Sequence, residues 1–408
     1  MIYKKSLCFK CLLSIAFICL AFAHIEIKHP IVIVPGIGGS QIEAKLSRNA
    51  STHYWCYKKY QDYFTVWLSI EELFPLSRDC WIDNMKLTYN EKEDRMENTE
   101  GVFTRIPGFG NTSGIEWLDP YVHGPGIYFF PLVDSLTRLL GYERGKTLRS
   151  APYDFRYHPG DAGDYFDRLK KLIEETYMMN GEKKIMLLSH SMGVPYSLNF
   201  LHRQTEEWKE KYIVAWTTIS GVFGGSMKAV KAFISGDGFG IPKVLDYPIT
   251  LRAFQRTFSS LPYILPDESF WAKDEVIVKT SNRTYTVHQY DDLFKDMGYP
   301  LASKIYAKTP KAWSEKPPNV KMFCFHGSGK DTPGVLNYRE GYFPNYTPDI
   351  TIDDGDGTVN LRSLQACQLW REKQKQPIIY EEFSRGEHNG VLGDARLIRS
   401  IIKALSED

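Results

Sequence analysis

The stretch from Lys184 to Gly193 constrains the fold of this chain more than any other. Residues 185–188 are a short continuous apolar run, which predicts a buried parallel strand. The pentad Ser189-His190-Ser191-Met192-Gly193 follows at once, and residues 194–202 are compatible with a helix. Small residues, Ser189 and Gly193, stand two positions before and after Ser191. A serine in such a setting between a strand and a helix is typical of a nucleophile elbow, which holds the hydroxyl above the sheet. Ser191 is therefore a candidate nucleophile, provided that the chain supplies its partners.

Strands alternate with helices on both sides of this stretch. Strand patterns cover 31–34, 147–155, 212–219, 320–325, 349–352 and 377–383, and helical patterns cover 129–140 and 161–179. Such alternation predicts a parallel sheet covered by helices, the α/β class. From residue 222 to about 316 the alternation breaks down into glycines, aromatic residues and short apolar runs, which indicates an inserted cap.

Partners for Ser191 stand in two later loops. Asp354 and Asp356 follow the strand predicted at 349–352, and His388 follows the strand predicted at 377–383. Serine, acid, histidine is the chain order of α/β-hydrolases. Histidine must take the serine proton, and a carboxylate must fix the histidine tautomer. The residues alone leave the acid open between the two aspartates. Calcium binding is the alternative for this acidic loop, but the spacing and distal glutamate of an EF-hand are missing.

The N-terminus predicts entry into the secretory pathway. Lysines 4, 5 and 10 flank the apolar run 11–22, and Ala21-Phe22-Ala23 offers small residues for cleavage, so residues 1–23 are predicted to be a signal peptide. No run in the chain has the length of a transmembrane helix. Cleavage would remove three lysines and no acidic residue, changing the formal net charge from +1 to −2. This near-neutral balance does not favour nucleic-acid binding. We expect a lysosomal or extracellular protein.

Disulfides persist in an oxidising compartment, so the cysteines outside the signal peptide are expected to form them. Removal of the signal peptide leaves an even number of them, and we expect neighbours in sequence to pair, as Cys56–Cys80 and Cys324–Cys367. Glycosylation sequons predict exposed loops, and they begin at Asn49, Asn111, Asn282 and Asn345.

Six motifs, in sequential order, resemble those of one family. They are Pro35-Gly36-x-x-Gly39, Asp79-Cys80-Trp81-Ile82-Asp83-Asn84, Pro107-Gly108-Phe109-Gly110, Ala151-Pro152-Tyr153-Asp154, His190-Ser191-Met192-Gly193 and Asp354-Gly355-Asp356-Gly357-Thr358-Val359-Asn360. The chain resembles the lecithin:cholesterol acyltransferase family, and within it the lysosomal phospholipase A2 (group XV) branch. The resemblance covers essentially everything after the signal peptide. It implies an α/β-hydrolase fold with an inserted cap and lid and a small lipid-surface subdomain.

The resemblance also implies roles and boundaries. Ser191 would be the nucleophile, Asp356 the acid and His388 the base, with the backbone N–H groups of Ile37 and Met192 as the oxyanion hole. The hydrolase core would comprise 24–44, 126–221 and 317–408, the membrane-binding subdomain 45–125, and the cap 222–316 with a lid at 221–242. The two disulfides agree with the family pattern. Ile37 departs from the family, which commonly has Asp or Asn there, and this changes the polarity of the pocket rim.

The expected function is hydrolysis of phospholipid esters and O-acyl transfer through an acyl-enzyme, to water or to a lipid alcohol such as ceramide. The resemblance implies glycerophospholipid membranes or lipoprotein surfaces as partners and requires no cofactor or metal. Two alternatives remain. One is a phosphatidylcholine–sterol O-acyltransferase, and the other is an inactive lipid-binding protein, which the filled triad positions disfavour.

The segment 63–74 is the candidate membrane-binding element. Its large apolar residues roughly follow helical spacing, and the candidates are Phe64, Trp67, Leu68, Leu73 and Phe74. One interpretation is an amphipathic helix buried against the core. The other is an apolar face that stays exposed and inserts at a lipid interface, where tryptophan is favoured.

Overall fold

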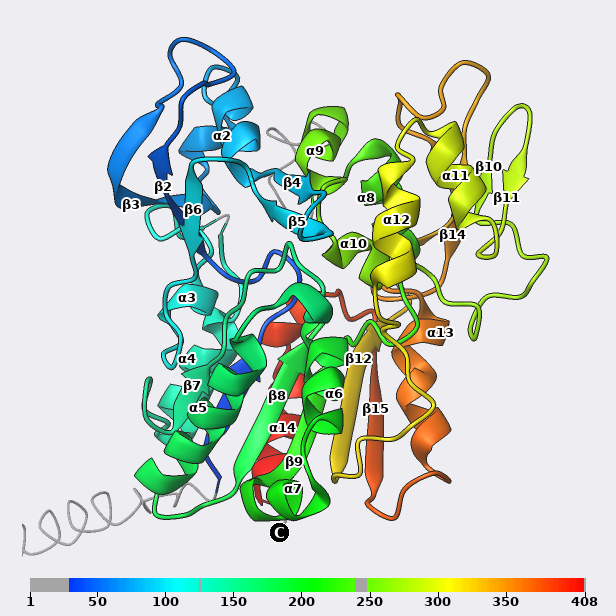
Figure 1. The fold of residues 1–408 in the computed structure, drawn as a ribbon. Coiled ribbons are helices and arrows are strands. Elements are labelled where there is room, and N and C mark those ends of the chain that lie inside the picture. The colour runs from blue at the N-terminus through cyan, green and yellow to red at the C-terminus, as the bar shows by residue number, and fades with distance from the viewer. Residues whose placement is uncertain (1–28, 125, 239–247, 407–408) are drawn as a thin grey trace, which may run out of the picture.

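A central parallel sheet organises the computed structural model, which describes residues 29–124, 126–238 and 248–406 (Figure 1). The predicted signal peptide lies outside the described residues. The sheet has six strands in the order β15-β12-β9-β8-β1-β7, and each neighbouring pair is parallel. Its strands are β1 (Ile31–Val34), β7 (Leu148–Ser150), β8 (Ile185–His190), β9 (Ile213–Ile219), β12 (Met322–Ser328) and β15 (Ile378–Ser384). The predicted α/β-hydrolase class is confirmed.

Helices cover both faces of this sheet, and this explains the unbroken apolar runs of its strands. In β1, Val32 and Val34 join the buried cluster that contains residues of α5 (Tyr165–Met179) and α6 (Gly193–His202). Ile31 and Ile33 face the other way, into the cluster of α4 (Phe130–Leu140) and α14 (Ala395–Ser406). Other helical elements in the described part of the core are η2 (Pro159–Asp161), α7 (Glu206–Tyr212), α13 (Leu361–Leu364), η4 (Gln365–Trp370) and η5 (Gly390–Gly393).

A small subdomain precedes most of the core. It contains a three-stranded sheet in the order β3-β2-β6 and the hairpin β4–β5. Its elements are β2 (Ile42–Ser47), β3 (Lys59–Trp67), η1 (Glu71–Leu73), α2 (Arg78–Met85), β4 (Leu87–Asn90), β5 (Arg95–Asn98), β6 (Val102–Arg105) and α3 (Ser113–Glu116). The predicted disulfide Cys56–Cys80 is present here, and Cys324–Cys367 joins β12 to η4 in the core. The side chains of all four sequon asparagines are exposed.

The helix predicted over 63–74 is wrong, because this segment is strand β3 followed by the short η1. Its aromatic and β-branched residues favour a strand, and β3 pairs with β2. Trp67, Leu68 and Leu73 are buried. The Trp67 indole donates to the Gly38 carbonyl (2.7 Å). These three residues are therefore core residues and not a lipid-facing surface, whereas Phe64 is half-buried and Phe74 is exposed.

The cap contains helices and a second sheet, in the order β11-β10-β13-β14. Its elements are α8 (Met227–Ser235), α9 (Pro248–Gln255), α10 (Ser260–Tyr263), β10 (Val278–Lys279), β11 (Thr284–Tyr285), α11 (Tyr290–Asp296), α12 (Leu301–Lys308), β13 (Thr332–Asn337) and β14 (Asp349–Asp353). The strand predicted at 349–352 was assigned to the wrong sheet, because β14 runs antiparallel to β13 in this smaller one. The cap sheet therefore includes β13 and β14, although every residue after 316 is predicted from the sequence to belong to the core. Part of the predicted lid, 239–242, lies outside the described residues.

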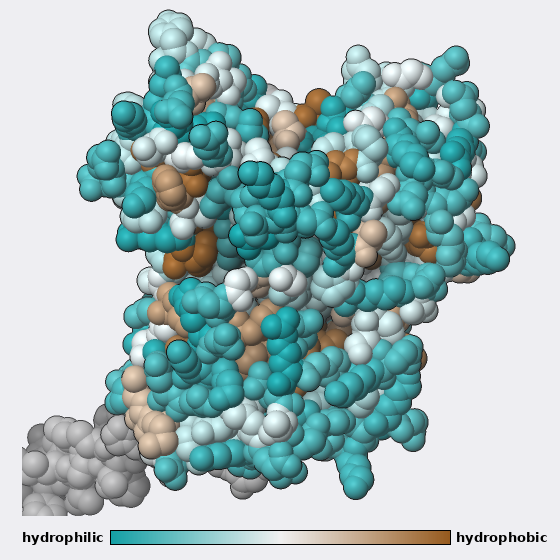
Figure 2. Space-filling model, viewed as in Figure 1, coloured by the Kyte–Doolittle hydropathy of each residue, from teal (hydrophilic) through white to brown (hydrophobic). Residues whose placement is uncertain are grey.

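The subdomain and the cap stand side by side at one end of the core (Figure 1). Apolar surface gathers in the notch between these two lobes and below the subdomain (Figure 2). Among the described residues, no helix combines the length and the apolar character needed to cross a bilayer.

Candidate active site

Ser191 lies in the tight turn between β8 and α6. Its φ angle is 55°, in the left-handed region that an elbow requires. Its N–H donates to the Ile219 carbonyl on β9 (3.0 Å), which anchors the turn to the sheet. A side chain at Gly193 would collide with the carbonyl oxygens of Val34 and Pro35, so close packing of the turn against β1 requires glycine.

Three predicted residues meet at this turn. The His388 ring is hydrogen-bonded through Nε2 to Ser191 Oγ (2.9 Å) and through Nδ1 to Asp356 Oδ2 (2.7 Å). All three side chains are buried. The Asp354 carboxylate instead accepts the N–H groups of Gly329 and Gly355. The geometry therefore favours Asp356 between the two aspartates that the residues alone left open.

The surroundings of Asp356 keep its carboxylate charged. Complete burial raises the pKa, but the charge and hydrogen bond of His388 and the N–H groups of Val359 and Thr358 hold the pKa below its ordinary value. Those two amides donate to Oδ1, leaving Oδ2 for the histidine. A charged, oriented carboxylate can fix the histidine tautomer and stabilise an imidazolium, and a histidine so held can take the serine proton.

The loop after β1 faces the same serine. A Cβ at Gly36 would lie 2.7 Å from Ser191 Cβ, so only glycine permits this approach. The Gly39 N–H donates to the Gly36 carbonyl (3.1 Å) and closes the turn around Ile37. Within the described part of the chain, neither the Ile37 N–H nor the Met192 N–H donates to another backbone group. Neither amide is therefore committed to a backbone partner there.

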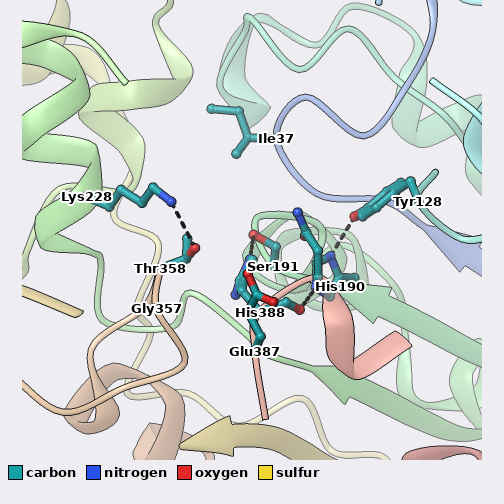
Figure 3. A pocket seen from close by; sticks show the side chains of 10 residues that line it. Ile37, Tyr128, His190, Ser191, Lys228, Gly357, Thr358, Glu387 and His388 are labelled. Atoms are coloured by element: carbon teal, nitrogen blue, oxygen red, sulfur yellow. Dashed lines mark hydrogen bonds between the residues drawn. The ribbon is translucent and has the colours of Figure 1, made fainter. Parts of the chain in front are cut away.

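The pocket above Ser191 brings in residues that no sequence pattern had indicated. Lys228, on α8, and Tyr128 lie on opposite sides of the opening, and Ile37 lies above the serine (Figure 3). Lys228 Nζ donates to Thr358 Oγ1 (3.3 Å) and is 3.8 Å from a carboxylate oxygen of Asp237. The remaining lining residues are His190, Gly357, Glu387, His388 and Asn389. Lys228 and Tyr128 belong to none of the six family motifs, and only the folding of the chain brings them to the pocket.

Comparison with known proteins agrees with this architecture. A family model described as lecithin:cholesterol acyltransferase matches residues 63–305 and 293–395. The chain is 39% identical over 377 residues to the lysosomal phospholipase A and acyltransferase of Homo sapiens, covering 92% of this chain and 90% of that protein. It is 35% identical over 361 residues to the phosphatidylcholine-sterol acyltransferase of Mus musculus, covering 88% and 81% of the two chains.

Among solved structures, a chain of the Tle4–Tli4 complex matches with a TM-score of 0.50 and 13% identity, covering 92% of this chain and 98% of that one. At this identity the likeness concerns the fold alone. The family model and the two relatives go further, because each spans most of the chain. This chain is an enzyme of the lecithin:cholesterol acyltransferase family.

Proposed function

We propose that this enzyme cleaves acyl esters of glycerophospholipids and transfers the acyl group to water or to a lipid alcohol such as ceramide. The observation that carries the proposal is the unbroken hydrogen-bonded series Asp356–His388–Ser191 at the base of a pocket. The printed activity of the human relative, phospholipase A and acyltransferase, supports the choice of lipid esters.

The proposed reaction has two halves. Ser191 Oγ attacks the ester carbonyl while its proton passes to His388 Nε2, and the resulting oxyanion is held by the N–H groups of Ile37 and Met192. His388 then protonates the departing lysolipid oxygen, which leaves an acyl-enzyme. The hydroxyl of water or of a lipid alcohol attacks the acyl carbonyl while His388 takes its proton. The bond between the acyl carbon and Ser191 Oγ then breaks, and His388 returns the proton to that oxygen. No step needs a cofactor or a metal.

The cation at the pocket opening supports a phosphate-bearing substrate. Lys228 Nζ faces the pocket and donates to the neutral Thr358 hydroxyl. Its carboxylate neighbour, Asp237, is more closely paired with Lys231 (2.8 Å). Lys228 can therefore meet a phosphodiester without first breaking a close ion pair.

Exposed aromatic and aliphatic residues beside the Cys56–Cys80 disulfide support docking on a lipid surface. Leu76 is 81% and Tyr54 is 92% exposed, and Trp55 and Phe74 are about half exposed. The Trp55 indole donates to the Leu76 carbonyl (3.0 Å), so the two arms of the disulfide loop present one surface. Tryptophan and tyrosine suit the boundary between water and lipid. We propose these four residues, the disulfide-loop patch, in place of the buried set at 67–73.

We also propose a lysosomal or extracellular, glycosylated protein. The N-terminal pattern, two disulfides and four exposed sequons support this location.

Labelling and lipid assays test the proposed reaction together. A fluorophosphonate should modify the protein once, at Ser191, and Ser191→Ala should abolish both labelling and release of labelled fatty acid from phosphatidylcholine liposomes. Adding ceramide should divert label into acylated ceramide. Transfer to sterol alone would identify a sterol acyltransferase, and an unlabelled protein that binds liposomes without turnover would identify a lipid-binding protein. Activity retained in Ser191→Ala would refute the assignment.

A further inference from the structure

A second series of hydrogen bonds runs behind the candidate triad. The Gly36 N–H donates to the Tyr128 hydroxyl (3.0 Å), which lies 2.6 Å from His190 Nδ1. The opposite ring nitrogen, Nε2, lies 3.0 Å from the carbonyl oxygen of His388. Figure 3 shows Tyr128, His190 and His388 in succession, from three segments far apart in the chain. The side chains of Tyr128 and His190 are buried, which shields these bonds from bulk water.

Only one arrangement of protons satisfies the series. The His388 carbonyl can only accept, so Nε2 of the neutral His190 ring carries the proton and Nδ1 is the acceptor. The Tyr128 hydroxyl therefore donates to Nδ1, and its oxygen accepts the Gly36 N–H. Burial, together with the nearby His388, lowers the pKa of His190 to about 3. The neutral tautomer that the series needs therefore persists well into the acid range.

The series ends at the loop of the proposed base and at the loop of the proposed oxyanion hole. At one end, both backbone groups of His388 are held, because its N–H donates to the Asp356 carbonyl (2.9 Å) while its C=O accepts from His190. At the other end lies the N–H of Gly36, the residue before Ile37. A Cβ at Gly39 would lie 2.6 Å from the Tyr128 ring, so the tyrosine packs directly against this loop.

We infer that Tyr128 and His190 are positioning residues that hold the base loop and the oxyanion loop in register on either side of Ser191. The inference rests on the proposed function. The Tyr128 hydroxyl uses its proton and accepts one bond within the series, and the His190 ring uses both nitrogens. Neither group thus needs to contact substrate, and each acts through a neighbour. Small misplacement of reacting groups is costly in rate, which makes such a brace effective.

The first test is Tyr128→Phe, which removes one oxygen and leaves two buried polar groups without a partner. We expect kcat on a soluble short-chain ester to fall about 10- to 100-fold, with KM changed less than about threefold. Rates are normalised to active sites counted by fluorophosphonate labelling, so misfolded protein does not count. The matched control is Tyr142→Phe, a buried tyrosine whose hydroxyl donates to the His29 carbonyl (2.6 Å) outside the site. It should keep wild-type kcat.

The second test is at His190. His190→Leu should lose activity as Tyr128→Phe does, whereas His190→Gln, which keeps a donor and an acceptor, should recover at least part of it. Wild-type kcat per site in Tyr128→Phe would overturn the inference, as would equal losses in both tyrosine variants. A rise in KM with unchanged kcat would instead make Tyr128 a substrate contact. Failure of the proposed function is separate, because it requires activity in Ser191→Ala.

Discussion

At the scale of single residues, the site depends on keeping a carboxylate charged where water is absent. Asp356 is fully buried, yet His388 and two amides hold its pKa low. Its charge would therefore be available when His388 becomes an imidazolium in the proposed reaction. The carboxylate of Asp354, two residues earlier, accepts the N–H groups of Gly329 and of the adjacent Gly355. Two chemically identical side chains thus have different roles because of their partners.

Exchange of each aspartate for asparagine separates these roles. Asp356→Asn should lower kcat by about 10³- to 10⁴-fold, because the amide no longer holds the productive histidine tautomer. Asp354→Asn keeps an acceptor for the Gly329 and Gly355 amides and should retain most of the activity. Steady-state rates on a soluble ester measure both variants. Equal losses would remove Asp356 from the triad.

The depressed pKa of His190 makes a prediction about stability. In the unfolded chain His190 binds a proton as the pH falls below about 6.5, whereas in the folded protein it stays neutral until about pH 3. The unfolded state therefore binds more protons in this window, and the folded state loses stability as the pH drops. Between pH 7 and pH 4, protonation of His190 in the unfolded state lowers the free energy of unfolding by about 3 kcal/mol. The variant His190→Gln has no titrating group there and should not show this loss.

Unfolding in denaturant at pH 7 and pH 4 measures this effect. Wild-type protein should be more stable than His190→Gln at pH 7, and that advantage should shrink or reverse at pH 4. An advantage that stays constant between the two pH values would contradict a neutral, buried His190.

In the proposed function, Lys228 distinguishes phospholipids from neutral esters. Lys228→Met keeps much of the side-chain volume but removes the cation beside the pocket. Activity on phosphatidylcholine should fall about tenfold, the effect of losing one charge-assisted hydrogen bond, while activity on diacylglycerol with the same acyl chains should change little. Lys311→Met is the control, because Lys311 pairs with Glu268 (2.6 Å) and does not line the pocket. Equal losses on both lipids would argue against a phosphate contact.

At the scale of elements, the sequence predicts best where burial leaves one solution. Continuous apolar runs such as 185–188 become strands of the parallel sheet because helices cover both faces. The prediction for 63–74 was wrong because the spacing of its large residues fits a helix, whereas its aromatic and β-branched composition fits a strand. The strand at 349–352 was recognised but misplaced, since an acidic loop can follow a strand of either sheet. Local pattern finds strands and does not assign them to sheets.

The two disulfides should have different consequences when removed. Replacing Cys56 and Cys80 by serine should lower stability by about 2–4 kcal/mol and loosen the disulfide-loop patch. Liposome hydrolysis should then fall more than hydrolysis of a soluble ester at temperatures below the melting transition. Cys324 lies on β12 of the core sheet, and both it and Cys367 are buried. Replacing this pair should lower both activities together with the thermal midpoint. Parallel behaviour of the two double variants would show that the first bridge has no special relation to lipid docking.

At the scale of the whole molecule, the subdomain is fastened to the core by buried polar contacts. Arg156 is fully buried, and its guanidinium is paired with Asp154 and donates to the Met85 carbonyl and to Asn98 of the subdomain. Such contacts, like that between Gly36 and Tyr128, join residues tens of positions apart. Motif order predicted Ser191, His388 and the acidic loop, but it could not predict Lys228, Tyr128 or the exposed patch, which exist only after the chain folds.

In the proposed function, the disulfide-loop patch brings the folded enzyme to the surface of a bilayer. Net charge near zero offers little attraction to a membrane, so apolar contact must supply the binding. Replacing both Trp55 and Leu76 by serine removes large exposed apolar groups and no buried contact of the core sheet. Liposome binding and hydrolysis of liposomal phospholipid should fall at least about tenfold, while hydrolysis of a soluble ester and the thermal midpoint should stay close to wild type.

The matched control is Leu139→Ser, which removes an exposed leucine from α4 of the core. It should leave binding to liposomes unchanged, because α4 belongs to the hydrolase core and not to the subdomain that carries the patch. Sedimentation with phosphatidylcholine vesicles measures binding directly, and fatty-acid release from the same vesicles measures turnover. If the double variant sediments as wild type does, lipid docking lies elsewhere. If soluble-ester activity and thermal midpoint fall in step with binding, the two residues stabilise the subdomain, and their exposed surface has no separate role.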